Sequence, residues 1–140
     1  MKANELAIGD YVLFATRITK VEGIAIGGFA IALENEGWQS IESVEPLPIT
    51  AEILEKNGFR VDGSGTNCRC LLSPMDEPGI RFNMYVGLKY KTIDVFAAHP
   101  QERTKGWRKS NKVYLEISGP YVHELQHAIR TCGIEKDIVL

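Results

Sequence analysis

The sequence lacks long apolar runs, internal repeats and low-complexity segments. None of its 140 residues belongs to an apolar stretch near the roughly 20 residues that a membrane-spanning helix needs. The first residues include an acidic side chain and no apolar stretch, unlike a secretory signal peptide. We therefore expect a cytoplasmic protein with no membrane segment. Its 44% apolar and 24% charged residues are typical of an ordinary globular chain.

Cysteine is scarce, with only Cys68, Cys70 and Cys132 present. An odd number without regular spacing argues against a disulfide scaffold. Cys68 and Cys70 are two residues apart, so a strand would place them on one face. They are expected to act as small packing residues, although sharing a metal with a histidine is an alternative.

An excess of one charge is also missing, because 16 basic and 18 acidic residues give a net charge of −2. The charge is nevertheless uneven: residues 99–112 carry about +4, and the rest of the chain carries about −6. Basic side chains there would neutralise phosphates, and a tryptophan would stack on an unpaired base. The candidate binding residues are Arg103, Lys105, Trp107, Arg108 and Lys109. A solvated hairpin loop is the simpler interpretation, and we favour it.

The chain is predicted to have an α+β fold. Residues 1–48 read as a small lobe of short strands, either an SH3-like β-barrel or a curled meander, with a tight turn at Gly27-Gly28. The strand spacing of Trp38 predicts a core position. Residues 49–140 are predicted to form an α+β lobe, and the two lobes could form one compact domain.

A first helix is predicted over residues 50–57. Thr50 is a suitable N-cap, and Ile49 and Leu54 have the spacing of a hydrophobic staple. Asn57-Gly58 provides a residue that can adopt positive φ and end the helix.

The rest of the second lobe is predicted as antiparallel strands followed by a second helix. The strands are expected near residues 59–62, 68–73, 79–87, 89–97 and 112–117. The helix is expected over residues 119–132, with Pro120 in its first turn and Gly133 after its end. Residues 134–140 are a candidate final strand.

Residues 123–127 read His-Glu-Leu-Gln-His, the HExxH pattern of zinc metallopeptidases. The pattern would supply His123 and His127 as zinc ligands and Glu124 as the general base. A third ligand is not found where it is expected, because Arg130 replaces the glycine of the extended pattern and few residues follow His127. An upstream ligand stays open as an alternative: Cys68, Cys70 or His99.

The helical projection separates the histidines from the apolar residues. The apolar stripe consists of Val122, Leu125, Ile129 and Cys132. His123, His127 and Arg130 fall on nearly the opposite side, so both histidines are expected to face water. We therefore interpret the HExxH pattern as accidental and expect no cofactor, with zinc as the alternative.

Three segments carry a family resemblance. They are Met-Lys-Ala-Asn-Glu-Leu and Ile-Gly-Asp-Tyr-Val within residues 1–12, Pro-Leu-Pro-Ile-Thr at 46–50, and Tyr-Val-His-Glu-Leu-Gln at 121–126. Together they resemble a family of short uncharacterised proteins of Bacteroidetes genomes, their phages and mobile elements. No activity is established for that family. Its usual ending resembles His-(Glu/Gln)-Leu-Gln-Asn, so the resemblance implies that His127 replaces an asparagine and completes the zinc pattern by substitution.

No Ser/His/Asp or Cys/His set has supporting context in this sequence, and His99 stands alone before a proline. We therefore expect a non-catalytic accessory protein of a phage or mobile element that binds another macromolecule, with a protein partner favoured. Nucleic-acid binding through residues 99–112 is one alternative function. A zinc metallohydrolase that uses the HExxH pattern is another.

Overall fold

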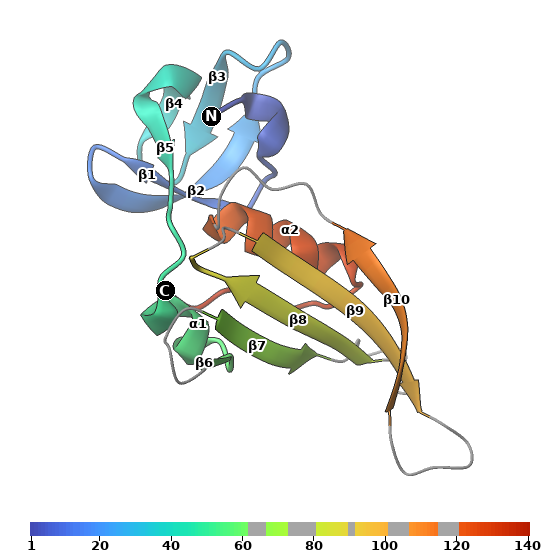
Figure 1. Ribbon diagram of the computed structural model, residues 1–140. Coiled ribbons are helices and arrows are strands. Elements are labelled where there is room, and N and C mark those ends of the chain that lie inside the picture. Colours follow the sequence, from blue (N-terminus) through green and yellow to red (C-terminus); the bar gives the residue numbers. More distant parts are fainter. Residues whose placement is uncertain (62–66, 73–80, 90–91, 101–106, 115–120) are drawn as a thin grey trace. The chain divides into compact units, whose positions relative to one another are not determined.

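The computed structural model describes residues 1–61, 67–72, 81–89, 92–100, 107–114 and 121–140. The chain divides into two compact units (Figure 1). The first unit consists of Met1–Pro48 with Tyr121–His123, and the second of Ile49–Pro120 with Glu124–Leu140. The described residues form antiparallel sheets and two α-helices, so the prediction of an α+β fold is confirmed.

The first unit is a five-stranded antiparallel sheet in the order β4-β3-β2-β1-β5. Its strands are β1 (Tyr11–Phe14), β2 (Arg17–Ile24), β3 (Ala30–Leu33), β4 (Gly37–Ser40) and β5 (Val44–Pro46). The first four form the predicted meander, and β5 returns to pair with β1. Residues 1–48 are all described, and within them β4 and β5 do not pair, so the strands do not close into a barrel.

The core of the first unit lies on the inward face of this sheet. Alternation along β2 and β3 buries Val21, Ile31 and Leu33, each at most 1% exposed. Val12 and Val44 join them from β1 and β5. Each fully buried aliphatic side chain of this kind contributes roughly 1.5–3 kcal/mol relative to an exposed one. This small cluster therefore accounts for the pairing of strands that are distant in the sequence.

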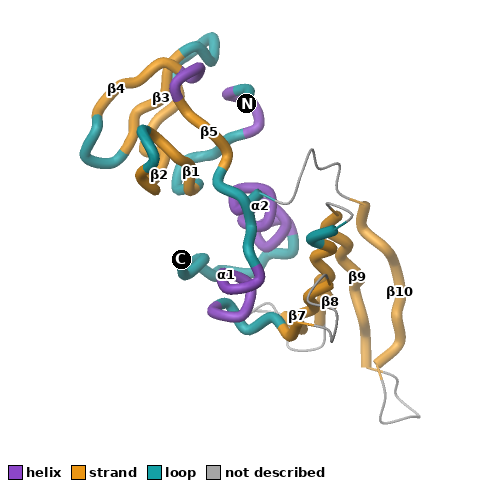
Figure 2. Tube along the Cα trace, turned by 60° about the vertical axis from the view of Figure 1, so that its left-hand side comes forward, coloured by secondary structure: helices purple, strands orange, loops and turns teal. Residues whose placement is uncertain are grey.

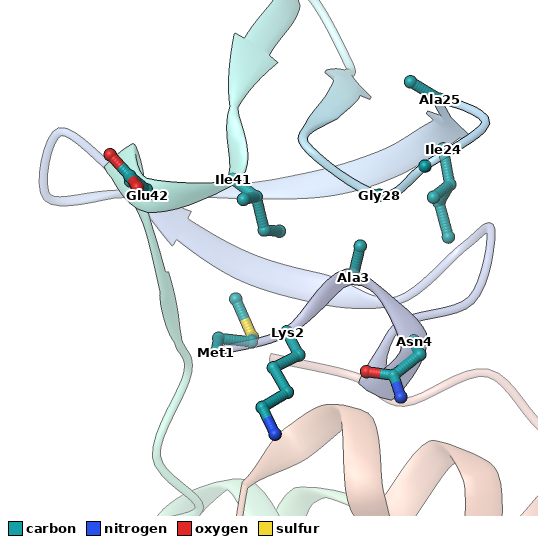
Figure 3. A pocket seen from close by; sticks show the side chains of 10 residues that line it. Met1, Lys2, Ala3, Asn4, Ile24, Ala25, Gly28, Ile41 and Glu42 are labelled. Atoms are coloured by element: carbon teal, nitrogen blue, oxygen red, sulfur yellow. The ribbon is translucent and has the colours of Figure 1, made fainter.

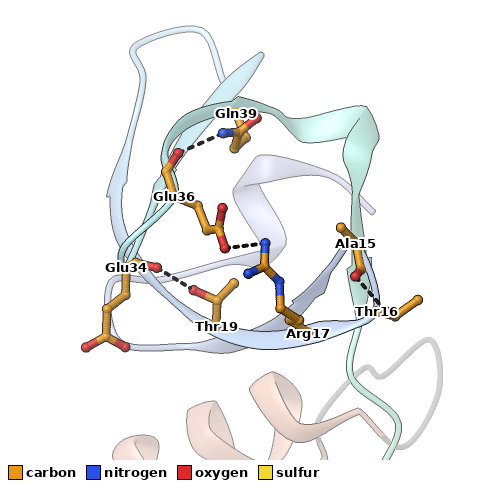
Figure 4. Close-up of polar contacts among 7 residues, drawn as sticks. All are labelled: Ala15, Thr16, Arg17, Thr19, Glu34, Glu36 and Gln39. Atoms are coloured by element: carbon orange, nitrogen blue, oxygen red, sulfur yellow. Dashed lines mark hydrogen bonds and ion pairs between the residues drawn. The ribbon is translucent and has the colours of Figure 1, made fainter.

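Polar contacts connect the turns of the first unit (Figure 4). Thr19 Oγ1 donates to the Glu34 carbonyl at 3.1 Å, and Gln39 Nε2 donates to the Glu36 carbonyl at 2.8 Å. The Arg17 guanidinium lies 2.7 Å from the Glu36 carboxylate. Arg17 is well exposed, so this ion pair contributes at most about 1 kcal/mol and acts mainly to orient the side chains.

The second unit contains a five-stranded antiparallel sheet in the order β10-β9-β8-β7-β6. Its strands are β6 (Arg60–Val61), β7 (Asn67–Leu72), β8 (Arg81–Gly87), β9 (Thr92–Pro100) and β10 (Trp107–Tyr114). The predicted loop over residues 99–112 is therefore wrong in part, because Trp107 pairs with Pro100 and the strands continue beyond the predicted ends. The high charge density of this segment suggested a loop. An antiparallel strand with one solvated face, however, also tolerates charges at alternate positions. Arg103 and Lys105 lie outside the described residues.

The two helices are α1 (Ala51–Lys56) and α2 (Val122–Thr131). Thr50 caps α1 as predicted, since its Oγ1 accepts from the Ile53 N–H at 3.2 Å. Gly58 and Gly133 follow the two helices with φ of +85° and +70°, the left-handed conformation that favours glycine. Helix α2 is shorter than predicted, and residues 119–120 lie outside the described part of the chain.

The core of the second unit lies between its sheet and α2. Met84 and Val86 of β8 and Ile93 and Val95 of β9 are at most 2% exposed and alternate with more exposed residues. Figures 1 and 2 show α2 along one face of this sheet. The buried apolar residues of α2 that belong to this unit are Leu125, Ala128 and Ile129. The sheet therefore uses one face for the core, and its other face carries Tyr85, which is 39% exposed.

The chain after α2 is held by the side chain of Asn57 and forms no strand, so the candidate strand at 134–140 is wrong. Asn57 is 2% exposed and follows the last residue of α1. Its Nδ2 donates to the carbonyls of Ile53 and Val139, both at 2.7 Å, and its Oδ1 accepts from the Val139 N–H at 2.9 Å. The Lys136 ammonium donates to the Asn57 carbonyl at 2.5 Å. The backbone N–H and C=O of Val139 are thus paired by one amide side chain and not by a neighbouring strand.

Asn57→Ala is expected to lower the free energy of unfolding by about 2–4 kcal/mol, because it removes three part-buried hydrogen bonds, two of which tie Val139 to the end of α1. Chemical denaturation monitored by circular dichroism would measure the loss. The matched control is Asn4→Ala at an exposed asparagine, which should change stability by less than about 0.5 kcal/mol. Equal stabilities of the two variants would contradict the role given to Asn57.

Candidate functional site

The HExxH residues lie in the first half of α2. His123 is only 3% exposed, His127 and Glu124 are partly buried, and Arg130 is exposed. The expectation that both histidines face water is therefore wrong for His123. The helical projection failed because the buried side of α2 is wider than its apolar stripe and also includes Gln126, which is 6% exposed.

The His123 ring packs against an aromatic neighbour. Its centroid lies 5.8 Å from that of Tyr121, and the two rings are nearly parallel, at 9°. The Nδ1 atom of His123 is buried. Stacking and burial hold this imidazole as part of the packing, whereas a catalytic zinc ligand has to face a cleft that substrate and water can enter.

A zinc site also needs a third protein ligand. Among the described residues, no group of three His, Cys, Asp or Glu side chains is placed to hold a metal ion. The upstream candidates Cys68, Cys70 and His99 are described only as strand positions on β7 and β9. The register pairs Cys68 with Val86 and Cys70 with Met84, two residues of the buried row. These observations give the zinc hydrolase no support.

Cys132 lies just after α2 and is 9% exposed. Burial raises the pKa of its thiol from 9.0 to about 11, because the charged thiolate is poorly solvated there. At neutral pH the thiolate is therefore a very small fraction of this cysteine. A nucleophilic role is not supported, since the thiolate is the reactive form.

Arg108 and Lys109, two candidate nucleic-acid residues, occupy positions on opposite faces of the second sheet. Lys109 pairs with Ala98, and a bulge follows between Lys109 and Asn111. Because of the bulge, Lys112 pairs with Phe96, two residues from Ala98, so positions 109 and 112 share a face. Arg108 pairs with His99 and belongs to the other face.

Cross-strand rows define the residues on the face of Lys109 and Lys112. The first row is Arg81–Ala98–Lys109, the second is Asn83–Phe96–Lys112 and the third is Tyr85–Asp94–Tyr114. Tyr85 of the third row is 39% exposed. The rows therefore bring basic and aromatic positions together on the face opposite to the buried row, a combination that the sequence shows only as scattered residues.

The first unit carries a second candidate surface around a groove of about 470 Å³. Its lining residues are Phe29, Ala30, Trp38, Gln39, Ser40, Ile41 and Glu42. Phe29 is 69% exposed and Trp38 is 62% exposed. The prediction of a core position for Trp38 is wrong, because β4 is an end strand of the sheet and Gln39, not Trp38, lies opposite the buried Ile31.

Small residues determine where the Trp38 ring lies. Trp38 pairs with Ala32 of β3, which pairs with Gly23 of β2. A Cβ atom added to Gly23 would lie 3.5 Å from the Trp38 ring and 3.4 Å from the Ala32 Cβ. The indole thus rests across two strands on a platform of glycine and alanine. The sequence did not predict this surface. Its signal was a glycine and an alanine on two strands, and only the strand pairing brings these residues together.

A second cavity, of about 610 Å³, adjoins the N-terminal residues (Figure 3). Met1 to Asn4, Ile24, Ala25, Gly27 and Gly28 line it together with Ile41 and Glu42, which also line the aromatic groove. The Gly28 position would place a Cβ atom 3.0 Å from that of Ala3, so a glycine is needed for this close approach. The two hollows therefore meet at Ile41 and Glu42.

Comparison with protein-family models, curated proteins and solved structures gives no significant match. Within the described residues, no helix is long and apolar enough to cross a membrane.

The purified, untagged chain is expected to retain far less than one zinc ion after incubation with zinc and desalting. The reason is that His123 is stacked and buried, and the described residues contain no group of three side chains placed to hold a metal ion. Elemental mass spectrometry would measure the metal. Retention near one zinc per chain that His127→Ala abolishes would overturn this expectation and restore the hydrolase.

Proposed function

We propose that this chain is a non-catalytic binding protein that recognises another macromolecule through the first unit. The observation that carries the proposal is the exposure of large apolar side chains there. Phe29 and Trp38, which both line the groove of about 470 Å³, are 69% and 62% exposed. Apolar side chains gathered beside a groove are typical of protein interaction sites, because contact with a partner removes them from water.

We further propose that the first unit is an SH3-like module and that the chain belongs to the family of Bacteroidetes, phage and mobile-element proteins it resembles. Five short strands, with β1 paired to both β2 and β5, support the first part. The sheet curls at a register shift between Val21 and Gly23. A small curled sheet of this kind provides a rigid support for exposed side chains. A protein with an accessory role acts by binding and needs no catalytic residues.

Trp38→Ala is expected to remove most of the affinity for the partner, about 30-fold or more, because an exposed tryptophan at the centre of an interface often contributes 2 kcal/mol or more. Quantitative affinity capture from a lysate of the host, followed by titration of the recovered protein, would measure the loss. Ile8→Ala is the matched control, since Ile8 is 66% exposed and does not line the groove. Equal losses in both variants, with unchanged thermal unfolding, would contradict the proposal.

A second candidate function is the binding of single-stranded nucleic acid by the second unit. The strand register supports this candidate function, because the positions of Arg81, Lys109 and Lys112 share a face with those of Phe96 and Tyr85. Basic side chains neutralise phosphates, and aromatic rings stack on unpaired bases, in proteins that bind single strands on a sheet. Arg103, Lys105, Trp107 and Arg108 of the basic segment also stay candidates, and of these Arg103 and Lys105 lie outside the described residues.

Replacing Lys109 and Lys112 together by Glu is expected to abolish binding of a single-stranded oligonucleotide at low salt, because two phosphate contacts become repulsive. Fluorescence anisotropy over a salt series would measure it. The matched control replaces Lys2 and Lys56 by Glu, the same charge change at exposed residues elsewhere. Absence of binding by the wild-type chain at low salt would exclude this second candidate.

A further inference from the structure

Resting on the proposed binding function, we propose that the groove between Phe29 and Trp38 takes a lysine or arginine side chain of a basic peptide segment, with Glu42 as its counter-charge. The partner is therefore a protein with an exposed, extended, positively charged stretch. Glu42 would repel a polyanion, and a neutral apolar segment would leave Glu42 without a counter-charge.

The aromatic side chains supply the first part of the argument. Phe29 and Trp38 line one groove and are both more than 60% exposed, so ring surface is open to a ligand. A cation above an aromatic face is attracted by the ring quadrupole, most strongly with tryptophan. The same unit already uses this interaction, since the Lys20 ammonium lies 5.0 Å from the centre of the Tyr11 ring.

Glu42 supplies a negative charge at the same groove. The residue is exposed, and its backbone N–H donates to Ser40 Oγ at 3.4 Å at the start of the 3₁₀ turn Ile41–Ser43. Its carboxylate forms no ion pair with the described residues. A carboxylate beside two rings distinguishes a cationic side chain from an apolar one, because the cation gains both interactions.

The charge of the whole unit favours the same partner. Residues 1–48 contain three basic residues against seven acidic ones. The basic residues are Lys2, Arg17 and Lys20; the acidic ones are Glu5, Asp10, Glu22, Glu34, Glu36, Glu42 and Glu45. Arg17 already forms an ion pair with Glu36. The acidic residues outnumber the basic ones, so the unit keeps an excess of negative charge. Complementary charge accelerates encounter with a basic segment and disfavours nucleic acid at this surface.

The end position of β4 indicates an extended conformation for the bound segment. Within the described sheet, β4 pairs only with β3, and the groove residues Trp38, Gln39 and Ser40 belong to β4. An end strand leaves alternate N–H and C=O groups available for hydrogen bonds to an added peptide backbone. The peptide backbone would align with β4 while its cationic side chain enters the groove.

The test uses an array of 12-residue peptides in matched pairs, one rich in lysine and arginine and the other with glutamine at the same positions. Fluorescence anisotropy with the full chain is expected to show binding of the basic member at least about 10-fold tighter than its partner, and this preference should weaken with salt. Glu42→Gln should weaken binding about 3- to 10-fold, and Trp38→Ala should weaken it by more.

Glu45→Gln is the matched control, because it removes the same charge from an exposed residue of the first unit that does not line the groove. Equal effects of Glu42→Gln and Glu45→Gln would overturn the assignment of Glu42 and leave only a general charge effect.

Basic and glutamine peptides that bind equally well through Trp38 would overturn the cation preference but keep the proposed binding function. A host partner that is captured equally by wild type and by Trp38→Ala would overturn the binding function itself. Self-association that Trp38→Ala abolishes and basic peptides do not compete would assign the groove to a second copy.

Discussion

The structure depends on one constraint: among the described residues, each of its two sheets buries apolar side chains on only one face. Side chains alternate along a strand, so burying Ile31 and Leu33 in the first unit turns Ala32 outward. Burying Met84 and Val86 in the second unit likewise exposes Tyr85. The face that is not buried is then available for function, and both candidate surfaces are built on it.

The two surfaces differ in chemistry because the charges divide between the units. The first unit is acidic and presents tryptophan and phenylalanine beside Glu42, a combination suited to a cation. The second has Lys109 and Lys112 at positions that share a face with Phe96 and Tyr114. A net charge of −2 for the whole chain hides this division. The local charge at each surface, placed by strand pairing, therefore differs from what the total charge of the chain suggests.

The helix α2 shows why a short motif needs its structural context. HExxH spacing brings two histidines to one side of a helix, which is necessary for zinc but does not create an open site. Here the ring of His123 stacks on Tyr121, and the surrounding helix is buried on a broad side. Asn57 gives the opposite lesson: one asparagine at a helix end, with no motif around it, holds the chain 82 positions later through Val139.

The sequence by itself determined the features that depend on neighbours along the chain. The Thr50 cap, the glycines after both helices and the turn at Gly27-Gly28 were predictable because each needs only a few consecutive residues. Tertiary structure alone decided the exposure of Trp38, the burial of His123 and the shared face of Lys109 and Lys112. Those outcomes depend on which strand lies at the end of a sheet, how wide a helix face is covered and where a bulge shifts the register. The physical reason is that burial and pairing are set by residues distant in sequence, whereas capping and turns are set by hydrogen bonds between near neighbours.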